Sequence, residues 1–192
     1  MMRPQVLSLL LAFTAVPFAV HANEAAPTEC DVVALSRDTG SGTLSIHAGP
    51  ESAQPEIAVV PTSYEAAGHR FATELRITGS HKGWLRIVSA TTNDYITDDP
   101  SETVFEGTGW IPGSQVHLVV EGSVLRAFPQ DDAPVATDFT HQRPGDYGPD
   151  FFRVDAVHAC VGHWVEVEGT YFLDRVRGWS SDTCANQVTT CP

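Results

Sequence analysis

Gly83-Trp84-Leu85-Arg86-Ile87-Val88 is the stretch that decides the fold, because a degenerate copy follows later as Gly162-His163-Trp164-Val165-Glu166-Val167. In each copy a glycine-containing turn leads into a run with apolar residues on alternate positions. This pattern is typical of a β-strand that leaves a hairpin. One such run is unremarkable, but two in one chain indicate a repeat if the flanking segments recur as well.

Three further landmarks recur in the same order around these strands. They are residues 44–47 with 125–128, residues 75–79 with 154–158, and residues 108–110 with 177–179. The offset is 81 residues from Leu44 to Leu125, 80 from Trp84 to Trp164 and 69 from Trp110 to Trp179. An internal duplication with loops of different length explains landmarks that keep their order while their spacing changes.

The rest of the chain also favours β-structure. No long segment has a helical period, and the nearest candidate, residues 63–72, is short and interrupted by Gly68. Short runs with alternating apolar or β-branched residues are instead separated by turns that contain Gly and Pro. These runs are residues 43–47, 57–60, 75–78, 84–89 and 116–120. The pattern predicts an all-β protein made of a sandwich or small barrels.

The N-terminus has the three parts of a cleavable signal peptide. Met1-Met2-Arg3 gives a positive start, residues 6–20 form an almost unbroken apolar run, and Val20-His21-Ala22 places small residues where a signal peptidase cuts. The run is shorter than the about 20 residues that a membrane span needs, which disfavours an uncleaved anchor. We expect residues 1–22 to be removed, no membrane span after processing, and a periplasmic or secreted mature chain.

The charge of the mature chain narrows its partners. Removal of Arg3 leaves 10 basic against 24 acidic residues, a net charge of −14, compared with −13 for the full chain. The resulting field repels polyanions, so we expect neither nucleic acid nor anionic lipid as a partner.

The four cysteines all lie beyond the signal, which fits two disulfides formed after export. They are Cys30, Cys160, Cys184 and Cys191. Cys184 and Cys191 enclose a short loop and are the preferred pair, which leaves Cys30 to pair with Cys160. Pairing of Cys160 with Cys184 stays open on the sequence alone.

The first copy resembles the bacterial SH3-like (Src homology 3) domain. A strand that ends in a Gly-Pro turn is matched by Leu44-Ser45-Ile46-His47-Ala48-Gly49-Pro50, and a hairpin that ends in Gly-Trp-x-x-Val is matched by residues 83–88. A closing Gly-Trp-Ile/Val step before a short turn of helix is matched by Gly109-Trp110-Ile111-Pro112. The second copy is similar but has Phe128-Pro129 in place of the Gly-Pro turn, and its closing Trp179 runs into the cysteine-bearing tail.

This resemblance implies two small SH3-like barrels in tandem, each of five to six strands. The expected organisation is a signal peptide at 1–22, an N-terminal extension at 23–31, a first domain at 32–120 and a degenerate, disulfide-bonded second domain at 121–192. Exported bacterial domains of this family usually act as binding modules, often for cell-wall peptides or other envelope proteins. They commonly accompany a catalytic domain, for which the two copies leave no room.

The expected ligand-binding residues are aromatic: Trp110, Tyr95, Trp84 and Trp179. Trp84 and Trp164 enter strands, where a large ring most often fills a small core. Trp110 and Trp179 follow glycines on the closing step and are better placed to line a groove for an extended peptide. Tyr95 belongs to residues 91–104, which with residues 138–152 form two long connections that break the strand rhythm.

Other chemistry-bearing clusters carry less weight. His158, Cys160 and His163, with Asp155 upstream, could share one side of a strand and turn, but the cysteine is expected in a disulfide and a further metal ligand is missing. A nucleophilic Cys160 would lack the activated setting that a low-pKa thiol needs. The acidic loop 94–102 lacks the spacing of a calcium loop. We therefore expect no catalytic residue, no metal and no cofactor.

The function that these features favour is a non-enzymatic binding or adaptor module of the cell envelope. Its ligand would be a cell-wall peptide from peptidoglycan or a segment of a partner envelope protein. The alternative is a secreted inhibitor or immunity-type protein that blocks a cell-wall enzyme or toxin, because small size, disulfides and acidity suit that class as well. An enzyme is a third and less favoured class. The sequence does not identify the ligand, since this scaffold serves many.

Overall fold

The computed structural model describes residues 26–92, 101–140 and 152–187. Within these ranges nearly every element is a β-strand, and the one helical element is the 3-10 turn η1 (Gly113–Gln115), so the predicted all-β class is confirmed. The expected signal peptide, Tyr95 and Cys191 lie outside the described residues. No helix among the described residues is long and apolar enough to cross a membrane.

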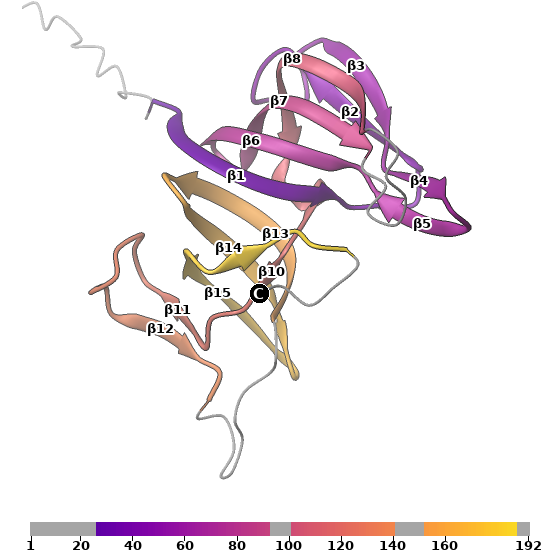
Figure 1. Cartoon of the computed structure of the whole chain (residues 1–192). Coiled ribbons are helices and arrows are strands. Elements are labelled where there is room, and N and C mark those ends of the chain that lie inside the picture. The colour runs from indigo at the N-terminus through magenta and orange to yellow at the C-terminus, as the bar shows by residue number, and fades with distance from the viewer. Residues whose placement is uncertain (1–25, 93–100, 141–151, 188–192) are drawn as a thin grey trace, which may run out of the picture.

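Two seven-stranded sheets follow one another along the chain and curl into half-barrels (Figure 1). The first sheet contains β1 (Thr28–Ser36), β2 (Thr43–His47), β3 (Glu56–Pro61), β6 (Glu74–His81), β7 (Trp84–Thr92), β8 (Glu102–Pro112) and β9 (Val116–His117). The second contains β10 (Val119–Val120), β11 (Val124–Arg126), β12 (Val135–Asp138), β13 (Phe152–Val161), β14 (Trp164–Tyr171), β15 (Asp174–Ser180) and β16 (Thr183–Cys184). The change of sheet falls at Leu118, which is buried.

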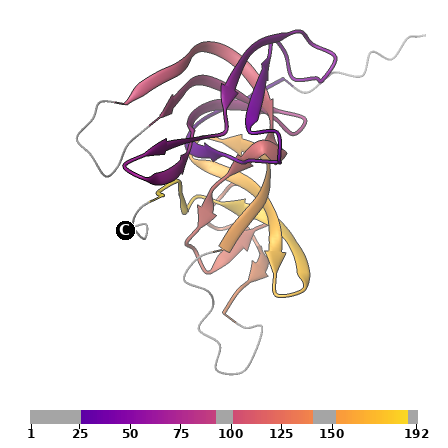
Figure 2. The ribbon, with the colours of Figure 1, turned by 90° about the vertical axis from the view of Figure 1, so that its right-hand side faces the viewer.

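A small hairpin of β4 (Ser63–Ala66) and β5 (His69–Ala72) projects sideways from the first half (Figure 2), and the backbone of Ala72 at its end exchanges hydrogen bonds with the Gln187 side chain of the second half. This is the segment that came nearest to a helical pattern. β1 starts at Thr28, so the first sheet includes residues that the sequence placed in the N-terminal extension 23–31. Each sheet has seven strands where the SH3-like resemblance implied five to six, because strands of only two residues, β9 and β10 among them, extend the sheets.

The strand order supports the duplication. It is β3-β2-β8-β7-β6-β1-β9 in the first sheet and β12-β11-β15-β14-β13-β10-β16 in the second, so every strand has a counterpart in the same place. The pairs His81↔Trp84 and Val161↔Trp164 close equivalent hairpins, so the offset of 80 residues found in the sequence also relates matching positions in the structure. We call the two parts the first half and the second half.

The predicted offset of 81 at the opening hairpin is wrong by two residues. His47 pairs with Trp110 and Arg126 pairs with Trp179, so Arg126 is the counterpart of His47 and the offset is 79. A shift of two residues along a strand returns each side chain to the same face, so the hydrophobic pattern could not distinguish the two alignments.

The offset in β6 and β13 is 80 instead of the expected 79. Ile77 faces Ile87, and Val157 faces Val167. Both strands carry register shifts next to these residues. An extra residue at a bulge breaks the alternation on which the sequence alignment relied.

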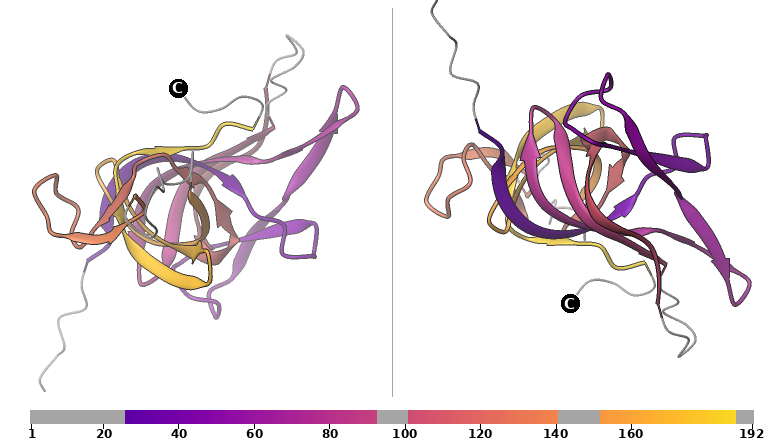
Figure 3. Two further views of the ribbon diagram at one scale, coloured as in Figure 1. Left: turned by 90° about the horizontal axis from the view of Figure 1, so that it is seen from below. Right: turned by 90° about the horizontal axis from the view of Figure 1, so that it is seen from above.

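The two halves share one hydrophobic core. Its buried members come from both sheets and include Leu44, Leu85 and Ile111 of the first and Leu125, Val165 and Val167 of the second. Views along the long axis show the strands of both halves curling around this common interior (Figure 3). Each half therefore buries apolar side chains against the other half, and burial in one depends on the presence of the other.

A disulfide joins the halves between β1 and β13. It links Cys30 to Cys160, which confirms the predicted pair and excludes the alternative with Cys184. The Cys160 amide donates to the Ser80 hydroxyl at 2.9 Å. Cys184 is itself disulfide-bonded, but its predicted partner Cys191 lies outside the described residues.

The backbone of η1 also meets the second half closely. A Cβ at Gly113 would come within 1.7 Å of the carbonyl oxygen of Val157 in β13, and the Gly113 amide donates to the Gly83 carbonyl at 2.9 Å. Only a residue without a side chain allows β13 to pack at this distance.

Replacing both Cys30 and Cys160 with serine should lower the free energy of unfolding by about 3–5 kcal/mol. The cross-link spans a sequence separation of 130 residues, so its loss frees a long loop in the unfolded chain. Urea denaturation of the oxidised wild type and the double variant measures this change. An unchanged midpoint would contradict it.

Gly113→Ala should destabilise the protein by about 2–3 kcal/mol, because the new methyl group overlaps the backbone of β13. Gly122→Ala is the matched control, since its Cβ would meet only the side chain of Asp182, at 3.3 Å. We expect a change within about 0.5 kcal/mol for the control. Equal denaturation midpoints for the two variants would show that β13 does not press on η1.

Candidate functional site

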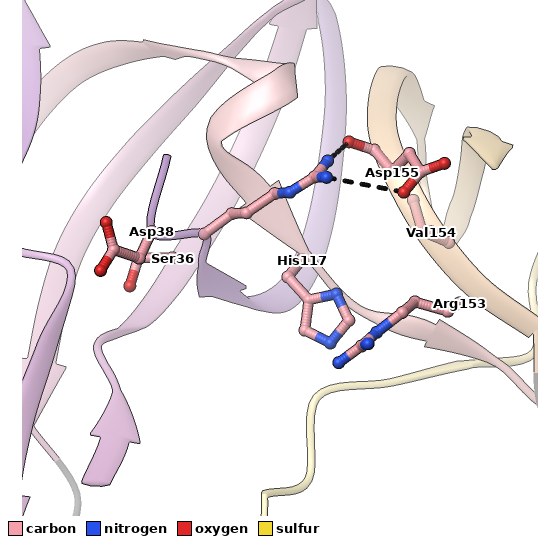
Figure 4. A pocket seen from close by; sticks show the side chains of 7 residues that line it. Ser36, Asp38, His117, Arg153, Val154 and Asp155 are labelled. Carbon is pink, nitrogen blue, oxygen red and sulfur yellow. Dashed lines mark hydrogen bonds and ion pairs between the residues drawn. The ribbon is translucent and has the colours of Figure 1, made fainter. Parts of the chain in front are cut away.

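Two of the surface hollows in the described part of the chain bring together several charged or aromatic side chains. One, the tryptophan groove, is defined by Arg126, Trp164 and Trp179 with the carboxylates of Glu121, Asp131 and Asp182, and has a volume of about 440 Å³. The other, the inter-half cleft, is lined by Ser36, Arg37, Asp38, His117, Arg153, Val154 and Asp155 and has a volume of about 360 Å³ (Figure 4).

Strand register builds the tryptophan groove. Arg126 ends β11 and pairs with Trp179 of β15, which in turn pairs with Glu166 of β14, two residues beyond Trp164. The Trp164 ring is largely buried, with 8% exposed, whereas Trp179 is half-buried. The Arg126 guanidinium donates to the carbonyl of Ala133 at 3.1 Å, which fixes it at the end of the hairpin.

The first half carries the same three positions. By strand pairing, His47, Trp84 and Trp110 are the counterparts of Arg126, Trp164 and Trp179. The buried tryptophan occupies the other position of the pair in this half, because Trp110 is 8% exposed while Trp84 is half-buried. The Trp84 ring meets His47 edge-on, with centroids 5.3 Å apart. Thus each half buries one tryptophan and leaves the other partly open.

The four predicted ligand residues have different surroundings. Trp179 lines the tryptophan groove, Trp84 is half-buried against His47, and Trp110 is almost fully buried. Tyr95 lies outside the described residues. None of the four tryptophans belongs to the shared core cluster, although one in each half is buried.

The sequence missed Arg126 and the three carboxylates of the tryptophan groove. Glu121 precedes β11, Asp131 follows it and Asp182 follows β15, so the three carboxylates converge on the groove only in the folded structure. The only local signal was the pair of tryptophans, since the counterpart relation of Arg126 and His47 was hidden by the two-residue alignment error. Aromatic rings beside carboxylates are suited to ligands that carry positive charge.

The inter-half cleft was not predicted from the sequence. Its residues end and follow β1, occupy β9 and lie near the start of β13, so both halves contribute. Arg37 donates to the backbone carbonyl of Asp155, and its guanidinium lies 3.6 Å from the Asp155 carboxylate. This contact spans the cleft (Figure 4).

His117 is half-buried, and the charges of two arginines act on its ring. Burial is the main cause that lowers the pKa of this imidazole, and the charges of Arg153 and Arg37 lower it further. A backbone hydrogen bond with Val154 and the carboxylate of Asp155 act in the opposite direction but do not offset these effects. His117 is therefore held toward its neutral form in the folded protein.

The cluster around Cys160 does not assemble as one site. The Cys160 sulfur is bonded to Cys30, the His158 Nε2 lies 3.0 Å from Glu168, and the His163 ring lies 6.0 Å from Trp164. Burial and then the positive charges of Arg177 and Arg175 lower the pKa of His158, while the carboxylate of Glu166 acts in the opposite direction.

Comparison of the chain with protein-family models, curated proteins and solved structures found no match. The class of protein therefore rests on what the chain itself displays, which is an all-β protein of two repeated half-barrel sheets.

Lowering the pH from 7.5 to 5.5 should reduce stability, and His117→Gln should make this loss smaller. The folded-state pKa of His117 is below its unfolded value of about 6.5, so the unfolded chain binds more protons as the pH falls through that value. Stability is then full above about pH 6.5 and declines below it. Urea midpoints across this range measure the slope.

His158 shifts in the same direction, so part of the slope should remain in His117→Gln and be lost in the variant that also carries His158→Gln. A slope equal to that of the wild type in both variants would contradict the assignment.

Proposed function

We propose that the chain is an exported, non-enzymatic binding module on a doubled SH3-like scaffold that recognises an extended peptide through the tryptophan groove. The ligand would come from the peptide part of peptidoglycan or from a partner protein of the envelope. The observation that carries this proposal is the recurrence of one trio of positions in both halves, opened into a groove with three carboxylates in the second.

The SH3-like scaffold is supported by the places of its motif residues. Gly49-Pro50 follows β2, Gly83-Trp84 opens β7, and Gly109-Trp110 lies near the end of β8. The short helical turn that the family places after this last motif corresponds in position to η1.

The chemistry of the groove favours a peptide with a basic side chain. The half-buried Trp179 supplies a ring surface at low entropic cost, and Glu121, Asp131 and Asp182 supply negative charge around it. A lysine-like ammonium beside a ring and a carboxylate gains both cation–π and charge-assisted contacts. The overall charge of −13 would steer such ligands toward the protein.

Export agrees with this function. The disulfide between Cys30 and Cys160 fits an oxidising compartment. The predicted signal peptide would deliver the chain to the envelope, where peptidoglycan peptides and partner proteins are the available ligands.

The protein should co-sediment with purified peptidoglycan, and Trp179→Ala should reduce its bound fraction at least about fivefold, since a stacked ring contributes on the order of 1 kcal/mol or more. Trp84→Ala removes the half-buried tryptophan of the first half, which lies outside the tryptophan groove, and is the matched control. We expect it to bind like the wild type.

A set of synthetic peptides that differ only in a central lysine, serine or glutamate distinguishes the ligand chemistry. Tryptophan fluorescence should report saturable binding of the lysine peptide and none of the glutamate peptide. Equal binding by the Trp179→Ala and Trp84→Ala variants, or no binding of peptidoglycan or any peptide, would refute the proposal.

A further inference from the structure

The inter-half cleft holds two arginines, two carboxylates and one imidazole that is held toward its neutral form. Arg37, His117 and Arg153 face it, together with Asp38 and Asp155. Basic side chains are scarce in this chain, which has 11 basic and 24 acidic residues. The partners of the two carboxylates decide how much charge is left over.

Both carboxylates are already engaged. Asp155 meets the Arg37 guanidinium at 3.6 Å and also accepts from the Thr170 hydroxyl at 3.4 Å. Asp38 accepts from the amides of Gly40 at 2.8 Å and Gly42 at 3.3 Å. These two backbone hydrogen bonds hold the pKa of its carboxyl below the usual value.

Asp38 is also bound from outside the cleft. Its Oδ2 lies 3.1 Å from Arg70, and in Figure 4 its carboxylate points away from the His117 ring. Asp155 is thus paired with Arg37 and Asp38 with Arg70, so neither carboxylate pairs with Arg153.

Arg153 has no carboxylate partner among residues 26–92, 101–140 and 152–187. Its side chain is exposed at the start of β13, and it extends toward the His117 ring (Figure 4). One guanidinium and one titratable imidazole thus face a cleft whose two carboxylates already have arginine partners. Such a cluster is stabilised when an anion supplies the missing countercharge.

We propose that the inter-half cleft binds a small oxyanion group, a carboxylate or a sulfate- or phosphate-like group, between Arg153 and His117. The planar guanidinium of Arg153 offers two parallel donors, which match the spacing of two oxygens on such a group. The imidazole of His117 adds a donor from the first half. Because His117 belongs to the first half and Arg153 to the second, the bound anion contacts both halves. The cleft thus takes a negative group, whereas the tryptophan groove is proposed to take a positive one.

Binding and protonation of His117 are coupled. Arg153, Arg37 and Asp155 are the charged groups that act on its ring, with Asp38 on the wall of the cleft. A bound anion favours the imidazolium, so it raises the pKa of His117, and by linkage the anion binds more tightly at lower pH. This site does not depend on the proposed peptide function, and its test uses a different ligand.

Sulfate is the suitable probe, because its charge stays constant between pH 5.5 and 7.5. NMR titration of the full chain at constant ionic strength, kept with sodium chloride, should show saturable shifts of residues in the cleft. The pKa of His117, followed from its ring protons, should rise with sulfate. Arg153→Gln should weaken sulfate binding about tenfold or more, as expected on loss of a charge-assisted bidentate contact.

Two variants separate binding from a general effect of charge. Arg153→Lys keeps the charge but loses the fork, and should recover only part of the affinity. Lys82→Gln removes one positive charge in the turn that follows β6, outside the cleft, and should bind sulfate like the wild type. Unchanged spectra outside the cleft confirm that each variant is folded.

Acetate and phosphate titrations identify the source of the oxyanion. Saturation by acetate at the same residues assigns the cleft to a carboxylate, whereas saturation by sulfate and phosphate alone assigns it to a tetrahedral group. Shifts that sodium chloride reproduces, or equal sulfate affinity in Arg153→Gln and Lys82→Gln, would overturn the proposal.

Discussion

The packing of β13 against the first half is the contact on which the rest of the structure depends. Cys160 is tied to Cys30 near one end of the strand, and the Val157 carbonyl lies against the backbone of Gly113 farther along it. Arg37 reaches Asp155 near the start of the strand. Since the buried residues of both sheets form one cluster, this strand converts two incomplete half-barrels into one closed interior.

The same contact creates the inter-half cleft. His117 ends β9 in the first sheet, and Val119, two residues on, pairs with Arg153 of β13 in the second, so His117 and Arg153 come together at the boundary between the halves. Ser80 and Cys160, which the offset of 80 makes counterparts, also contact each other across this boundary, with the Ser80 hydroxyl donating to the Cys160 carbonyl at 3.3 Å. Contact between counterpart residues is the arrangement expected where two copies meet about an approximate two-fold axis.

The tryptophan groove shows how a repeat can diverge without changing its scaffold. Both halves keep two tryptophans and a hairpin residue at matching places, yet Trp110 is buried in one half and Trp164 in the other. The second tryptophan of each half, Trp84 in the first and Trp179 in the second, is half-buried, and the two have different surroundings. His47 covers Trp84 edge-on, whereas Trp179 lies in a groove with carboxylates.

The sequence by itself determined the all-β class and the duplication, because alternation and turn residues are local properties, and it favoured the pairing of Cys30 with Cys160, which the structure then selected from the alternatives. It could not place Leu125 opposite the right residue, since a slip of two keeps the same face of the strand inward. Only the tertiary structure decided which tryptophans are buried and which charges share a cleft. Those outcomes depend on strand register and on how β13 meets the first half, and both are set by packing over long stretches of chain.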